Sequence, residues 1–146
     1  MALSSFLLPL FTLVLWSLLI AALLGITRLW SAGKAGMHLA DLAPGTRGVD
    51  LQNQLPARAN WVSHNYTHLM EQPTVFYATM LALALAGAAD QLNLYLAWSY
   101  TLGRIIHSIW QINWNRIPVR ITLFTMNTLI LAVLAGRGLF FAVARM

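Results

Sequence analysis

Four long apolar stretches limit what this sequence can fold into. They cover about residues 3–29, 68–89, 92–110 and 118–143 of a chain of 146 residues. Each comes close to or exceeds the roughly 20 residues that a helix needs to cross a hydrocarbon core about 30 Å thick. We therefore expect an all-α membrane protein, a bundle of four transmembrane helices in a single domain over residues 1–146.

The composition agrees with a membrane environment and excludes several kinds of chemistry. Hydrophobic residues make up 59% of the chain and charged residues 9%, whereas a soluble domain has about a quarter charged residues. The chain has no cysteine, which excludes disulfides, thiolate metal sites and a nucleophilic cysteine. Any thiol in its chemistry must come from a substrate.

The nine basic residues are scattered, although the formal net charge is +5. They form no run and no stripe with aromatic residues, so we expect no nucleic-acid partner. One side of the predicted bundle receives six of them: Arg28, Lys34, Arg47, Arg58, Arg116 and Arg120. The other side receives Arg137 and Arg145. Because basic residues favour the cytoplasmic side, both chain ends are expected outside the cytoplasm.

The connections between the spans have distinct characters. Residues 31–55 are rich in glycine, proline, aspartate and asparagine, which predicts a long cytoplasmic loop. Pro56 suits the first turn of the next helix, and a tight hairpin is expected around Asp90-Gln91. The first six residues contain no Lys or Arg and no A-x-A site follows, so we expect the first span to be a retained helix and not a signal peptide.

Polar and ionisable residues lie inside the last three spans. Each ionisable group costs about 2.5–3.5 kcal/mol on insertion, and such groups normally face a bundle interior or an aqueous cavity. The candidates are Asn65, His68 and Glu71 in the second span, Arg104, His107 and Gln111 in the third, and Arg120 at the start of the fourth.

Helical geometry predicts that these groups meet at one depth. Relative to Arg104, His107 and Gln111 lie at about 300° and 340°, which places the three on one stripe. Counting from the hairpin, Glu71 lies within a turn of His107 and Gln111, and Arg104 lies roughly 9 Å deeper. Arg120 enters at about the level of Gln111. A cluster of arginines, a glutamate and amides suits a small peptide-like ligand that carries carboxylates and an amine.

Two motifs resemble a known family. Residues 65–73 read N-Y-T-H-L-M-E-Q-P and are followed by Phe76-Tyr77, which resembles the second-helix signature N-x-x-N/H-L-x-E-x-P-x-x-F-Y of the MAPEG family, the membrane-associated proteins in eicosanoid and glutathione metabolism. Residues 103–108 read G-R-I-I-H-S and are similar to its third-helix pattern G-R-x-x-H-S/T. Pro118-Val119-Arg120 is similar to the P-x-R that opens its fourth helix.

The resemblance implies a fold, a ligand and residue roles. The family forms left-handed four-helix bundles that assemble as homotrimers and bind glutathione between subunits near the cytoplasmic face. It implies that Asn65 or His68, together with Glu71, Arg104 and His107, holds the tripeptide and that Arg120 stabilises its thiolate. Gln111 stands where several members have a tyrosine; its amide can still hydrogen-bond a ligand.

The activity implied is that of a membrane-bound glutathione transferase or peroxidase, with glutathione as co-substrate and a lipophilic electrophile arriving from the bilayer. The expected partners are further copies of the chain, membrane lipids and that lipophilic small molecule. The expected location is a bacterial inner membrane, which the chain crosses several times.

Other readings of the same residues remain open. Glu71, Arg104 and His107 can simply pair to hold helices together. A non-catalytic subunit of a larger complex is the main alternative function, since Gln111 and Ile121 replace the tyrosine and a serine of other members. A metal or haem bundle is a weaker one, because His64, His68 and Glu71 share a face but no second converging histidine pair accompanies them, and we expect no metal.

Overall fold

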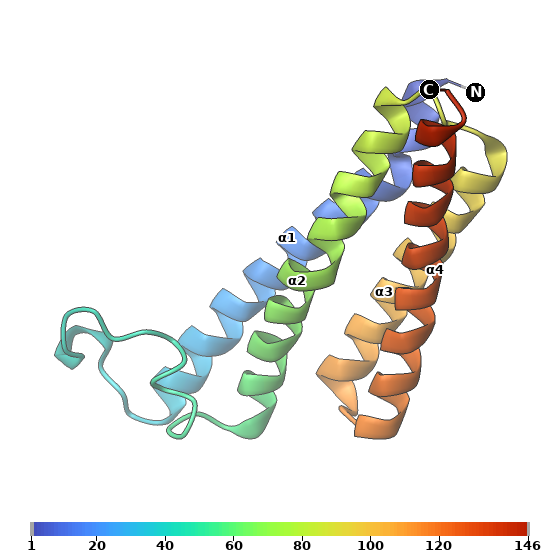
Figure 1. Cartoon of the computed structure of the whole chain (residues 1–146). Helices are drawn as coiled ribbons and strands as arrows, with labels where there is room; N and C mark the ends of the chain where they lie inside the picture. The colour runs from blue at the N-terminus through green and yellow to red at the C-terminus, as the bar shows by residue number, and fades with distance from the viewer. Residues whose placement is uncertain (1, 146) are drawn as a thin grey trace.

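The structure is a computed structural model that describes residues 2–145, without the side chain of Leu39. Four helices follow one another: α1 (Leu3–Lys34), α2 (Ala57–Leu85), α3 (Gln91–Asn113) and α4 (Ile117–Val143), with a short 3₁₀ helix at Leu39–Asp41. Both chain ends and the α2–α3 connection lie at one end of the bundle, and the other two connections lie at the opposite end (Figure 1). The expected all-α, four-helix architecture is confirmed, and residues 2–145 contain no strand.

The helices begin and end at residues whose backbone preferences require it. Pro56 is the N-cap of α2, one residue before the position expected for it. Gly87 has a φ of +66°, a left-handed conformation that glycine adopts without strain and that ends α2. Asp90 caps α3, because its carboxylate accepts a hydrogen bond from the Asn93 backbone N–H at 2.7 Å. The tight hairpin therefore lies where the sequence indicates it.

The four helices fall into two pairs of different hydropathy. By length and composition, α1 and α4 qualify as membrane spans among the described residues. Their outward surfaces are apolar, with exposed side chains such as Leu15, Leu18, Leu129 and Leu139. Helices α2 and α3 have lower hydropathy because they carry the polar side chains. Several of those side chains are buried inside the bundle, among them Asn65, Thr101, Arg104, His107, Ser108 and Gln111.

An apolar core joins the helices at the end that bears the chain termini. Helix α1 packs against α2 and α3, and α4 packs against α3 and α2. Phe76 and Tyr100 stack in this core with ring centroids 4.4 Å apart. At the opposite end a smaller cluster of Ala32, Leu55 and Ala59 holds residues 35–56 against α1 and α2.

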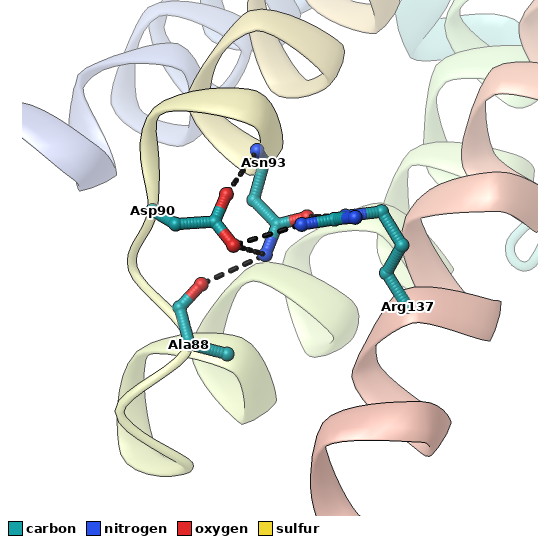
Figure 2. A network of polar contacts seen from close by, with 4 residues as sticks. All are labelled: Ala88, Asp90, Asn93 and Arg137. Carbon is teal, nitrogen blue, oxygen red and sulfur yellow. Dashed lines mark hydrogen bonds and ion pairs between the residues drawn. The ribbon is translucent and has the colours of Figure 1, made fainter.

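A polar clamp closes the end with the termini (Figure 2). Arg137 of α4 donates to the Asp90 carboxylate at 2.8 Å and to the Asn93 side-chain oxygen at 2.5 Å. The Asn93 amide in turn donates to the Ala88 carbonyl at 2.8 Å. The clamp thereby fixes the α2–α3 hairpin to α4.

Candidate functional site

Three helices contribute polar side chains to one cavity of about 360 Å³. His68 of α2, His107 of α3 and Arg120 of α4 line it. Its remaining wall is apolar and comes from α4, which contributes Ile117, Ile121 and Phe124. The cavity lies toward the end where α3 turns into α4, and its volume is within the range of small-molecule sites, about 300–1,000 Å³.

Arg104 holds His107 in a defined orientation. Its guanidinium lies 3.2 Å from His107 Nδ1 and donates to the backbone carbonyl of His68 at 2.8 Å. A guanidinium can only donate, so His107 Nδ1 must accept. In a neutral imidazole the proton is then on Nε2, which is buried. His107 thus brings an N–H donor to the cavity that it lines.

The two histidines lie against each other. The His68 and His107 rings are 6.3 Å apart at their centroids and nearly perpendicular, at 86°. His68 Nδ1 is buried and has no hydrogen-bond partner among residues 2–145. Each of the two rings that line the cavity therefore has one buried nitrogen without a hydrogen-bond partner in the described part of the chain.

Arg120 is held at the first turn of α4. One of its terminal nitrogens donates to the Asn115 side-chain oxygen at 2.8 Å, and Asn115 adopts a φ of 51° in the turn that precedes the helix. Asparagine tolerates this left-handed conformation better than most residues. The N-terminus of a helix also favours negative charge, so this corner of the cavity is suited to an anion.

Several buried polar atoms near the cavity lack partners within the described part of the chain. They are His68 Nδ1, Arg104 Nε, His107 Nε2, Trp110 Nε1, Arg120 Nε and both amide atoms of Gln111. Buried polar groups are nearly always hydrogen-bonded to protein or water. Gln111 is fully buried but does not line the cavity. The concentration of unpaired donors indicates a place for water or for a polar, predominantly anionic ligand.

Asn65 forms a hydrogen bond that joins α2 to α3. Its amide donates to the Ser108 hydroxyl at 2.7 Å, and the Trp16 indole N–H donates to the same hydroxyl at 3.0 Å. This contact ties α1, α2 and α3 together. Trp16 and Ser108 were not singled out as candidates, although Ser108 ends the G-R-x-x-H-S motif.

Glu71 does not line the cavity of its own chain. Its side chain is exposed, and it forms no hydrogen bond or ion pair with the described residues. It lies on an exposed stripe of α2 with His64, Thr67, Thr74 and Ala78. The spacing of three and four residues along this stripe is typical of a helix face that packs against another helix.

The donor set favours an organic anion over a metal ion. Among the residues that the structure describes, no three His, Asp or Glu side chains converge. The cavity instead combines a guanidinium with two imidazoles. Such groups bind carboxylates and stabilise thiolates through charge-assisted hydrogen bonds.

Comparison with known proteins places the chain in a family. No curated protein and no solved structure matches it. The model of the MAPEG family matches residues 6–140, which include every residue that lines the cavity. The match covers nearly the whole chain, and the chain therefore belongs to the MAPEG family.

Proposed function

We propose that the chain is a membrane-bound glutathione transferase or peroxidase that acts on a lipophilic electrophile. The observation that carries the proposal is a cavity that His68, His107 and Arg120 line opposite an apolar wall of α4, with one buried, unpaired nitrogen on each of these three side chains within the described residues. One side of this cavity suits the charged tripeptide, and the other suits an apolar second substrate. Members of this family generally use glutathione.

Each polar residue has a distinct proposed role. Glutathione supplies the thiol, and Arg120 favours its ionised form as any adjacent cation does. His107 donates its Nε2–H to a ligand oxygen, and His68 provides a second hydrogen bond. Arg104 is a positioning residue, because both of its bonded nitrogens are engaged by the protein itself.

Glu71 supports a trimer in which neighbouring subunits complete the site. An exposed carboxylate on a helix inside a membrane is costly unless it has a partner. A second copy packed along the stripe of His64, Thr67, Glu71 and Thr74 would shield it from lipid and bring it to a ligand's amine. Proteins of this family are generally trimeric.

The topology proposed for this enzyme has all four helices crossing the membrane. With 29 and 23 residues, α2 and α3 extend about 43 Å and 35 Å, which exceeds a hydrocarbon core of about 30 Å. The end with the long connection bears the excess of basic residues and would face the cytoplasm.

Isothermal titration of the purified protein with glutathione tests the proposal. We expect Arg120→Ala to weaken binding at least about tenfold, the loss of one charge-assisted hydrogen bond of about 1.5 kcal/mol or more. Arg116→Ala is the matched control, because Arg116 is exposed at the N-cap of α4 and does not line the cavity. Equal affinities for Arg120→Ala and the parent would remove the proposed role.

A turnover assay distinguishes the proposed enzyme from a non-catalytic subunit of a larger complex. With a chlorinated aromatic electrophile, an enzyme forms the thioether and releases chloride. Binding of glutathione without conjugation or peroxide reduction would favour the non-catalytic subunit, for which Gln111 and Ile121 are the supporting residues. Gln111, buried with both amide atoms unpaired within residues 2–145, lacks the phenol that other members have at this position.

A further inference from the structure

A second cavity, of about 480 Å³, lies between α1, the first turns of α2 and the end of α3. It shares no lining residue with the cavity of His68 and Arg120. Leu23, Trp30, Val62 and Ile112 form its apolar wall, and Arg58 lies at its border. The cavity is thus a mainly apolar space with a cation beside it.

Two basic side chains, Arg58 and Lys34, lie beside this cavity, and neither forms an ion pair with a described acidic residue. Arg58 is exposed and forms no hydrogen bond or ion pair with the described residues. The Lys34 amino group lies 3.8 Å from the centroid of the Trp30 ring, which lines the cavity. Of the two acidic residues in the neighbouring connection, Asp50 is paired with Arg47, and Asp41 forms no ion pair with Arg58 or Lys34. The charge at this cavity is therefore available to an external anion.

The cavity lies where the helices leave the apolar region. Helix α1 is mainly apolar as far as Ile26, carries Arg28 after it and ends at Lys34. Trp30 is 63% exposed, and Trp110 and Trp114 pack together at the same end of the bundle with ring centroids 5.0 Å apart. Tryptophan concentrates at the boundary between hydrocarbon and head groups. An amphipathic ligand at this level would have its apolar part in the cavity and its charge beside Arg58.

We propose that this cavity binds an anionic phospholipid, with an acyl chain between α1, α2 and α3 and the phosphate beside Arg58 and Lys34. Charge complementarity selects this occupant. Basic pockets between helices on the cytoplasmic side of membranes are typical sites for anionic head groups. The proposal does not depend on glutathione, since the two cavities are separate.

Native mass spectrometry of the protein reconstituted with equal phosphatidylglycerol and phosphatidylcholine tests the proposal. We expect selective retention of phosphatidylglycerol. Arg58→Gln and Lys34→Gln should each lower that retention about fivefold, which corresponds to roughly 1 kcal/mol for each basic residue near an anionic lipid surface. Arg116→Gln, the same change of charge at the same end but outside the cavity, should leave retention unchanged.

Two further variants distinguish a lipid bound inside the cavity from a lipid attracted only by the charge of the surface. Ala57→Trp fills the cavity at an exposed position without changing the charge, and should displace the lipid. Equal retention of the two lipids, or equal losses in Arg58→Gln and Arg116→Gln, would overturn the proposal. Efficient disulfide formation between copies carrying Ala57→Cys, in a chain that otherwise lacks cysteine, would also overturn it, because a second copy would then cover the cavity.

Discussion

The polar clamp at the hairpin end leads to a quantitative prediction about stability. Arg137→Met keeps the length of the side chain and removes both donors. The Asp90 side chain is 37% exposed, so water replaces much of its ion pair and the loss there is about 0.5 kcal/mol. Asn93 is fully buried, and its oxygen would lose the Arg137 donor, at a cost of about 1–2 kcal/mol. The free energy of unfolding should fall by about 2 kcal/mol.

Denaturant titration of the protein in micelles measures this change. Arg145→Met is the control: Arg145 is exposed and donates to the Ala86 carbonyl at the same end, and its loss should cost less than about 0.5 kcal/mol. A double-mutant cycle with Asp90→Asn should give a coupling energy of about 0.5–1 kcal/mol. Glutathione affinity should not change, because the clamp is remote from the cavity. If Arg137→Met were no more destabilising than Arg145→Met, the assignment of the clamp as a stabilising contact would be refuted.

Two other predictions concern the site, and one concerns the packing of α3 against α4. Asn65→Ala should lower the free energy of unfolding by about 1 kcal/mol and leave glutathione affinity nearly unchanged, whereas His68→Ala should weaken glutathione binding. If calorimetry showed weaker binding for Asn65→Ala and unchanged binding for His68→Ala, then Asn65 and not His68 would be the ligand-binding residue. Gly103→Ala should destabilise the bundle by about 1–2 kcal/mol, because a Cβ there would lie 2.3 Å from the Asn127 side-chain oxygen, and Asn127→Ala should rescue it in thermal unfolding. Arg120→Lys should retain part of the binding that Arg120→Ala loses, since the charge remains but the planar donor pair does not; full retention would show that charge alone suffices.

The arrangement of the helices was largely predictable from the sequence. Apolar runs indicated the four helices, and Pro56, Gly87 and Asp90 mark where α2 and α3 begin or end. The level of the polar groups followed from the hairpin and the helical rise. His68 and His107 do lie in ring contact, although they are 39 positions apart in the sequence.

The direction of each side chain was less predictable. Three residues along a helix rotate the direction by about 60°, so Asn65, His68 and Glu71 span about 120° and point to three different surroundings. Asn65 meets Ser108, His68 lines the cavity, and Glu71 is exposed. Which of them faces the ligand depends on how α2 is rotated about its axis, and tertiary packing decides that rotation.

The contact between Arg104 and the His68 carbonyl could not be predicted from the sequence either. The helical rise places Arg104 roughly 9 Å deeper than the level of Glu71. Its long side chain reaches a backbone acceptor on the neighbouring helix and His107 on its own helix. Helical periodicity gives the stripe on which a residue lies, but it does not give the rotamer that the residue adopts.

Because the bundle has an even number of helices, the chain starts and finishes at the same end, beside the α2–α3 hairpin (Figure 1). Copies can therefore be joined head to tail in one gene by hydrophilic linkers that never have to thread a bilayer. A three-copy fusion with Arg120→Ala in one, two or three units would report whether the subunits work independently, from how activity falls with each substitution.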